Sequence, residues 1–233
     1  MAEIIEIIYD FLINNGFIIT AAVCGFDFLM FLILSLIAGK RKSGMARLMA
    51  FFALGMALES ATNLGGSLFT AGEVLFWINK GRYMLHGLLM ALFLPIATYA
   101  MDPITKGKVL IWLITLPFIA GGVFAGYMLT LEPVQMAYML RYVISDETVS
   151  WVKIVYHVIC IWGIIPLLLC GLYIKSREKN ISLILIAIFM LIFSVIGPAL
   201  KFFDVNFLIM ELGYAVMMLL FVIAALTIEV SEE

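Results

Sequence analysis

Long apolar stretches follow one another along almost the whole chain, with short polar segments between them. A membrane-spanning helix needs about 20 consecutive, mostly apolar residues. The sequence therefore predicts an all-α bundle of seven membrane-spanning helices, over residues 12–38, 46–69, 77–101, 107–130, 150–174, 181–203 and 206–229. Because these stretches use most of the 233 residues, we predict one membrane domain over residues 1–233 and no soluble domain.

The composition agrees with a chain whose main partner is the lipid bilayer. Hydrophobic residues make up 65% of the chain and charged residues 13%, which is more apolar surface than a soluble domain can bury. No basic cluster with interleaved aromatic residues indicates a nucleic-acid partner. All three cysteines lie within predicted spans, which favours small packing residues over a disulfide framework.

Lysine and arginine residues are unequally divided between the two ends of the predicted helices, and the more basic end of a membrane protein faces the cytoplasm. One end carries nine of them and the other carries five. We therefore expect the N-terminus outside and the C-terminus in the cytoplasm, most simply in the cell membrane. The start, MAEIIEIIYD, has no basic residue, so we expect the first span to be an uncleaved anchor. The nine are Lys40, Arg41, Lys42, Arg47, Lys106, Lys108, Lys175, Arg177 and Lys179.

Six of the seven predicted spans carry polar or ionisable side chains, although such groups are costly inside a membrane and typically mark functional sites. In the third span, Arg82 and His86 lie one helical turn apart. These groups fall at mid-membrane or in the outer half, so we predict an outward-opening polar pocket above an apolar inner half. The alternative is that the charges pair as salt bridges and only fix the helix packing. The candidate ligand-binding residues are Asp27, Glu59, Asn63, Arg82, His86, Lys153, His157, Lys201, Glu211 and Tyr214.

The two histidines of the chain, His86 and His157, lie at similar depths, each four residues after a cation, Arg82 or Lys153. Two histidines on different helices can ligate the iron of haem b axially, and the cations would suit its propionates. With nearby carboxylates, the same histidines can hold zinc or another divalent metal ion. The simplest alternative is that each histidine only forms a hydrogen bond with a carboxylate.

Two further segments are expected to make packing contacts. Gly122 and Gly126 form a G-x-x-x-G face in the fourth span, which permits close helix packing. We expect this face to pack within the bundle, and a homo-oligomer or a partner subunit is the alternative. The next connection has helical apolar spacing over 134–143, with Arg141 on another face, which predicts a short helix on the membrane surface or over the outer end of the bundle.

The third span begins with Arg82-Tyr83, and Glu211 opens the last span. With the length, the seven spans and the outside N-terminus, these residues resemble the microbial (type 1) rhodopsins, whose third helix starts with arginine-tyrosine and whose last helix carries an acidic counterion. The retinal-binding lysine of that family would stand four residues after the acid, where this chain has Ala215. The third-helix carboxylate position is Leu85. The resemblance implies a rhodopsin-like bundle that cannot form a retinal Schiff base, so we expect no light-driven function.

The sequence favours a non-enzymatic protein that binds a small ligand or ion in the polar pocket, as a sensor, receptor or transporter. In a transporter, Pro95, Pro166 and Pro198 would allow the helices to bend. No P-loop, nucleophile elbow or H-E-x-x-H motif supports nucleotide or ordinary hydrolase chemistry. Three alternatives stay open: a bis-histidine haem b electron-transfer subunit, a metal-dependent intramembrane hydrolase, and a structural subunit of a larger membrane complex.

Overall fold

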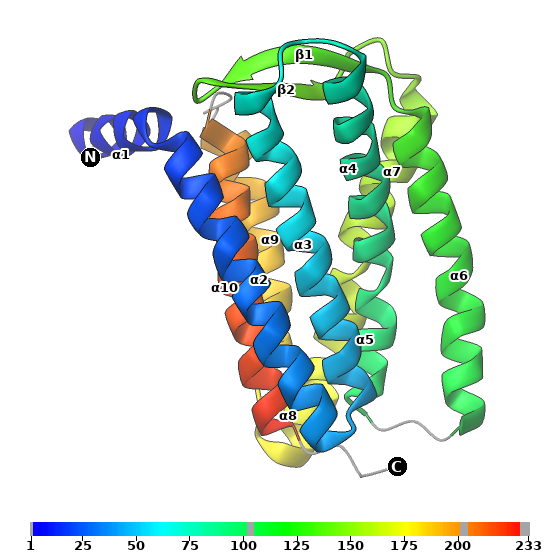
Figure 1. Ribbon diagram of the computed structural model, residues 1–233. Helices are drawn as coiled ribbons and strands as arrows, with labels where there is room; N and C mark the ends of the chain where they lie inside the picture. Colours follow the sequence, from blue (N-terminus) through cyan, green and yellow to red (C-terminus); the bar gives the residue numbers. More distant parts are fainter. Residues whose placement is uncertain (1, 102–104, 201–204, 229–233) are drawn as a thin grey trace.

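The helices of the computed structural model form a bundle, and a β-hairpin lies across one end of it (Figure 1). The structure describes residues 2–101, 105–200 and 205–228, with side chains for 6–101, 107–193 and 205–228. We call the two strands, β1 and β2, the hairpin. The end of the bundle that these strands cover is called the hairpin end. The elements are α1 (Ala2–Asn14), α2 (Gly16–Arg41), α3 (Gly44–Leu68), α4 (Glu73–Ala91), α5 (Phe93–Tyr99), α6 (Thr105–Met128), β1 (Leu131–Met136), β2 (Met139–Ile144), α7 (Ser150–Trp162), α8 (Ile164–Glu178), α9 (Ser182–Leu200) and α10 (Asn206–Thr227).

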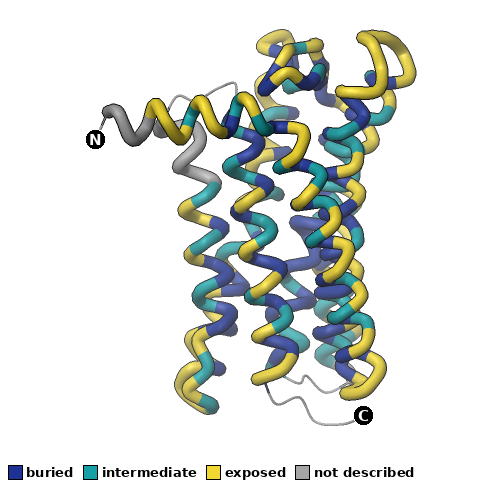
Figure 2. The backbone as a smooth tube through the Cα atoms, turned by 60° about the vertical axis from the view of Figure 1, so that its left-hand side comes forward, coloured by how far each residue is buried: buried dark blue, intermediate teal, exposed yellow. Residues whose placement is uncertain are grey.

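Most of these helices have the length and composition of membrane spans. Figure 2 shows buried and exposed positions alternating along the helices, so that one face of each points into the bundle. The apolar stretch of α9 that the structure describes, Ser182–Phe193, is shorter. The chain is therefore a helical polytopic membrane protein. Six segments among the described residues are long and apolar enough to cross a membrane: Gly16–Arg41, Gly44–Leu68, Glu73–Tyr99, Gly107–Met128, Ser150–Glu178 and Asn206–Thr227.

Two of these spans are interrupted near a proline. The break between α4 and α5 falls at Leu92, and the break between α7 and α8 falls at Gly163. Each lies three residues before a proline, Pro95 or Pro166. Proline lacks a backbone N–H, and its ring collides with the carbonyl group four residues earlier, so the helix breaks just ahead of it. The structure thus shows a helix interruption just ahead of Pro95, where the sequence predicts a kink, whereas the side chain of Pro198 lies outside the described residues.

The first helix, α1, was not expected from the sequence. It points sideways from the bundle near the hairpin end, roughly at right angles to the other helices (Figure 1). A single turn residue, Asn15, separates it from α2. Ile7, Ile8 and Phe11 of α1 are exposed. Exposed apolar side chains on a crosswise helix are typical of a segment that lies in the membrane interface.

The connection between α6 and α7 is the hairpin, and the prediction of a short helix over 134–143 was wrong. The strands are antiparallel, with Leu131 opposite Ile144. The apolar spacing did not distinguish the two structures, because the apolar positions of a ten-residue segment can fit the period of a helix and that of a strand. The aromatic and β-branched run of Tyr142, Val143 and Ile144 favours a strand once it can pack on the bundle. Tyr142 does so, because its ring lies 5.5 Å from that of Phe76 on α4.

The hairpin turn carries a backbone penalty that a substitution can remove. Ala137 and Tyr138 both have positive φ angles, 45° and 60°, as a type I′ turn requires. This left-handed conformation costs a residue other than glycine about 1–2 kcal/mol. Because Tyr138 is 70% exposed, we expect Tyr138→Gly to raise the free energy of unfolding by about 1 kcal/mol. Unfolding in mixed detergent micelles measures this difference. Tyr138→Ala keeps the penalty, so an equal gain from alanine would contradict the explanation.

The Gly122 and Gly126 face is used inside the chain. A Cβ atom on Gly122 would lie 2.5 Å from the carbonyl oxygen of Gly87, and one on Gly126 would lie 2.8 Å from that of Tyr83. Both acceptors belong to α4, so the glycines allow the backbones of α6 and α4 to meet. Internal packing, the first of the two expectations for this face, is confirmed.

Apolar side chains fill the half of the bundle away from the hairpin. Phe52, Phe93 and Phe221 come from three different helices, and the ring of Phe52 lies 4.8 Å from that of Phe93 and 5.5 Å from that of Phe221. Met45 and Met49 are fully buried beside them. This apolar half agrees with the expectation from the sequence, and it closes the bundle beneath the polar groups.

Candidate ligand-binding cavity

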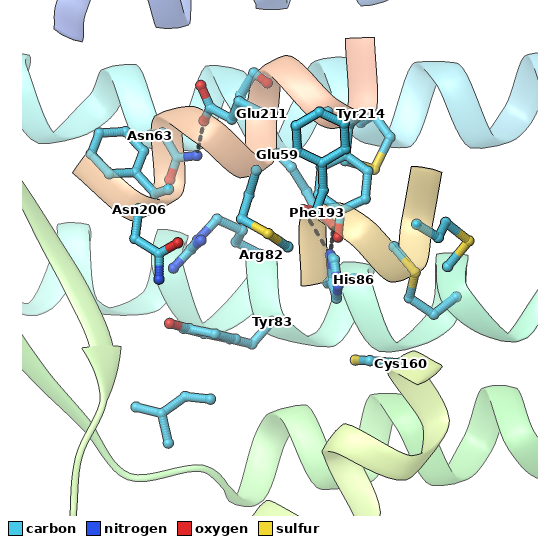
Figure 3. Close-up of a pocket in the computed structure, with 18 of the residues that line it drawn as sticks. Glu59, Asn63, Arg82, Tyr83, His86, Cys160, Phe193, Asn206, Glu211 and Tyr214 are labelled. Atoms are coloured by element: carbon cyan, nitrogen blue, oxygen red, sulfur yellow. Dashed lines mark hydrogen bonds and ion pairs between the residues drawn. The ribbon is translucent and has the colours of Figure 1, made fainter. Parts of the chain in front are cut away.

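A cavity of about 450 Å³ lies in the half of the bundle next to the hairpin. Side chains from α3, α4, α7, α9, α10 and the hairpin line it. Figure 3 shows polar groups on α3, α4 and α10 that point into a common space. The volume falls within the roughly 300–1,000 Å³ of pockets that bind small molecules.

Most of the candidate residues from the sequence meet at this cavity. Lys153 does not line it, because its Nζ lies 3.5 Å from Asp146 Oδ1 and donates a hydrogen bond to the Asp146 carbonyl oxygen. Lys201 lies outside the described residues. Asp27 is fully buried in α2 and also lies outside the lining. The candidates that line the cavity are Glu59, Asn63, Arg82, His86, His157, Glu211 and Tyr214.

The carboxylate of Asp27 has no hydrogen-bond partner in the part of the chain that the structure describes. A buried polar group without a partner destabilises a fold, so Asp27 is buried at a cost in stability.

His86 on α4 and Glu59 on α3 form a buried ion pair. The Nδ1 atom of His86 lies 3.0 Å from both carboxylate oxygens of Glu59. The two side chains are only 18% and 10% exposed. The His86 ring also lies 5.9 Å from the ring of Tyr214. For His86, the interpretation of a histidine bonded to a carboxylate is therefore confirmed.

His157 has a different environment. It is exposed at the edge of the cavity, and its Nδ1 lies 2.6 Å from the carbonyl oxygen of Lys153 on its own helix. The rings of His86 and His157 each lie near the ring of Tyr156, at 6.4 Å and 6.1 Å, and no contact joins them within the described residues. The haem alternative therefore stays a prediction.

The residues of the same region that the structure describes do not provide a set of metal ligands. Among the described residues, no group of three or more histidine, cysteine, aspartate or glutamate side chains lies close enough together to hold a metal ion. The hydrolase alternative needs such a set together with a carboxylate base. The ion pair of His86 with Glu59 supplies one histidine and one carboxylate.

Two guanidinium groups, from Arg82 and Arg141, enter the cavity with no carboxylate within ion-pair distance among the described residues. Arg82 stacks 4.4 Å from the ring of Tyr83, and its Nη2 donates a 3.2 Å hydrogen bond to the Tyr142 carbonyl. Arg141 stacks 3.9 Å from the ring of Phe207. The Nε atom of each is buried without a hydrogen-bond partner. Stacking on a ring occupies the face of a guanidinium and leaves its in-plane N–H groups for an acceptor.

Arg141 is the main cavity residue that sequence reasoning missed, because the segment was interpreted as a helix with Arg141 on another face. In a strand, alternate residues share a face, and Arg141 and Val143 both line the cavity. Burial, and next the cation of Arg82, lower the pKa of Arg141 to about 9, so it is mostly cationic at neutral pH. Asn206 and Tyr156 also line the cavity without having been predicted.

Glu211 carries the second of the two carboxylates that line the cavity in the described part of the chain, beside Glu59. It is 6% exposed, its Oε1 accepts a hydrogen bond from Asn63, and its Oε2 has no partner in the described part of the chain. The ion pair of His86 with Glu59 carries no net charge. Among the described residues that line the cavity, the two guanidinium groups of Arg82 and Arg141 therefore outnumber the one remaining carboxylate, that of Glu211, and the hairpin end of the cavity favours a negatively charged ligand.

No model of a known protein family matches this chain, and no curated protein matches it in sequence. The resemblance to microbial rhodopsins stays a prediction from a few residues, such as Arg82 and Tyr83. The function therefore has to be inferred from the chemistry of the cavity.

Proposed function

We propose that the chain is a seven-helix membrane protein that binds a small molecule in this cavity as a receptor, sensor or transporter, without catalysing a reaction. The seventh span would be α9, which has 19 residues. At 1.5 Å per residue this helix is about 28 Å long, close to the roughly 30 Å thickness of the hydrocarbon core of a bilayer.

The distribution of basic residues supports an orientation with the cavity facing outward. The connection between α2 and α3 and that between α8 and α9 lie at the end opposite the hairpin (Figure 1). They carry Lys40, Arg41, Lys175 and Arg177 in the adjoining helix ends. Because basic loops favour the cytoplasmic side, the hairpin end would lie outside the cell membrane.

The two guanidinium groups of Arg82 and Arg141, which have no carboxylate partner among the described residues, are the observation that carries the proposal. If the polar groups served packing alone, each buried cation would be expected to have a carboxylate partner, because an unpaired buried charge is costly. Instead, Glu59 is bonded to His86, and Glu211 is bonded to Asn63. A ligand with acceptor atoms would satisfy the N–H groups that the protein leaves unpaired.

Native mass spectrometry tests the proposal directly. We expect the full chain, extracted from its membranes in mild detergent, to retain a small-molecule adduct, and Arg82→Gln/Arg141→Gln to lose most of it. A hydrogen bond to a charged group contributes about 1.5–3 kcal/mol, or roughly 10- to 150-fold in affinity. Lys153 lies outside the cavity, so the variant Lys153→Gln is the control and should retain the adduct. No adduct on the wild-type chain, or equal adducts on all three proteins, would count against ligand binding.

A further inference from the structure

We propose that the ligand is a single-chain lipid anion, with a carboxylate or phosphate head and one apolar chain, and that it enters sideways from the bilayer between α7 and α9. This inference rests on the proposed function, because it assigns the chemistry of the molecule that the cavity binds. It follows from three features: a charged end, an apolar end and a side where the described helices make little contact.

The lining of the cavity changes from polar to apolar with distance from the hairpin. On α4, Arg82 lies nearer the hairpin and Met90 lies deeper, and on α10, Glu211 precedes Met217 in the same sense. At 1.5 Å per residue, Arg82 and Met90 are about 12 Å apart along the helix. Figure 3 shows most of the sulfur atoms on the far side of His86 from Asn63. A cavity with this gradient suits a molecule that is polar at one end only.

The charged end suits a head group that accepts several hydrogen bonds. Arg82 donates to the carbonyl oxygen of Tyr142, the residue that follows Arg141 on β2, so both guanidinium groups meet beneath the same strand. Guanidinium groups bind carboxylate and phosphate through paired, charge-assisted hydrogen bonds. A neutral head group would leave the positive charge of the pair uncompensated. The charge of the head should therefore determine affinity as strongly as the chain does.

The deep end suits a flexible chain. Met56, Met90, Phe189, Met190 and Met217 line it from α3, α4, α9 and α10. Methionine side chains are unbranched and polarisable, so they adapt to irregular apolar ligands. This lining offers no ionisable group to a second polar end.

Among the residues that the structure describes, little helix packing closes the side of the cavity between α7 and α9. In the described chain, α7 packs along α4 and α6, and α9 packs along α8 and α10, whereas α7 and α9 have little contact with each other. Both line the cavity, through residues such as Ile161 on α7 and Phe193 on α9. Ile161 is 52% exposed and shares a helix face with Ile154 and Val158, which are exposed and outside the lining. The cavity thus reaches the lipid-facing side of α7, where an amphiphile would enter.

Binding of radiolabelled hexadecanoate to the full chain in mild detergent tests the ligand class. We expect hexadecyl phosphate to compete for the site, and hexadecanol and hexanoate to compete at least tenfold more weakly, because each lacks one of the two required ends. Arg141→Gln should weaken hexadecanoate binding at least tenfold, and Lys153→Gln should leave it unchanged.

The entry route has its own test, which uses exposed positions so that folding is preserved. Ile161→Trp should slow the uptake of hexadecanoate from vesicles into the reconstituted protein at least tenfold. Ile154→Trp, on the same face but away from the cavity, should not change the rate. Equal rates for the two variants would overturn entry between α7 and α9.

The outcomes separate this inference from the proposed function. Hexanoate or inorganic phosphate that binds with dependence on Arg141, while hexadecanoate does not bind, would overturn the lipid assignment and leave a ligand site in place. Equal affinities for hexadecanol and hexadecanoate would overturn the anionic head. Failure of every probe, together with no adduct in native mass spectrometry, would overturn both.

Discussion

Replacing Gly66 with alanine is expected to push the hairpin away from α3 and to lower the free energy of unfolding by about 3 kcal/mol. A Cβ atom on Gly66 would lie 1.8 Å from the carbonyl oxygen of Leu140. The obstacle is backbone, so no side-chain rotation relieves it, and β2 has to move. Because Leu140 precedes Arg141 in β2, the same movement should displace that guanidinium and weaken ligand binding.

The neighbouring glycine provides a matched control. At Gly65 the nearest atom to an added Cβ is Phe69 Cδ2 at 3.7 Å, an ordinary van der Waals distance. Gly65→Ala should therefore be neutral or stabilising, because alanine favours a helix over glycine by up to about 1 kcal/mol. Unfolding in mixed micelles and retention of the adduct measure both variants. Equal stability of Gly65→Ala and Gly66→Ala would contradict the position of β2 against α3.

Glu59→Leu is expected to lower the free energy of unfolding by about 3–5 kcal/mol, because it removes one partner of a buried ion pair and leaves His86 without an acceptor. The two groups lie 3.0 Å apart and are mostly removed from water. Leucine keeps a similar volume, so the loss reports the interaction more than a cavity.

Restoring an apolar pair separates this interaction from packing. In Glu59→Leu/His86→Phe neither side chain has a buried polar atom to satisfy, so we expect this double variant to recover most of the lost stability. The four proteins of the cycle then give the coupling energy between the two positions. Additive losses in the double variant would show that Glu59 and His86 do not act as a pair.

The membrane helices could be predicted because the bilayer imposes a length and a polarity that appear directly in the sequence. The segments Gly44–Leu68 and Asn206–Thr227 agree with the predicted ranges to within a few residues. The ionisable residues of the third span could also be recognised in the sequence, because Arg82 and His86 interrupt an apolar run. Both residues line the cavity.

Partners across helices could not be predicted in the same way. Glu59 and His86 pair only because α3 and α4 have a particular relative rotation, which the pattern of a single helix does not encode. Lys153 and His157 had the same spacing as Arg82 and His86, yet Lys153 bonds to Asp146 instead of facing the cavity. Spacing along one helix determines which residues share a face, and not what that face meets.

The prediction of a helix over 134–143, where the structure has the hairpin, was the largest error. Because of it, Arg141 was not predicted to line the cavity. The position of the hairpin depends on the backbone contact between Gly66 and Leu140 and on packing of Tyr142 against α4. Both are long-range contacts, so the local apolar spacing could not reveal them. Because the segment is a strand, Arg141 lines the cavity together with Arg82. The polar pocket predicted from the sequence is therefore one that favours an anion.

A density map of the native protein, purified with its membrane lipids, tests the ligand site most directly. We predict an elongated non-protein density in the cavity, with its polar end between Arg82 and Arg141 and its other end against Met90 and Met217. An empty cavity in which Arg82 and Arg141 pair with Glu211 would contradict this result, because the guanidinium groups would then be part of the packing of the bundle.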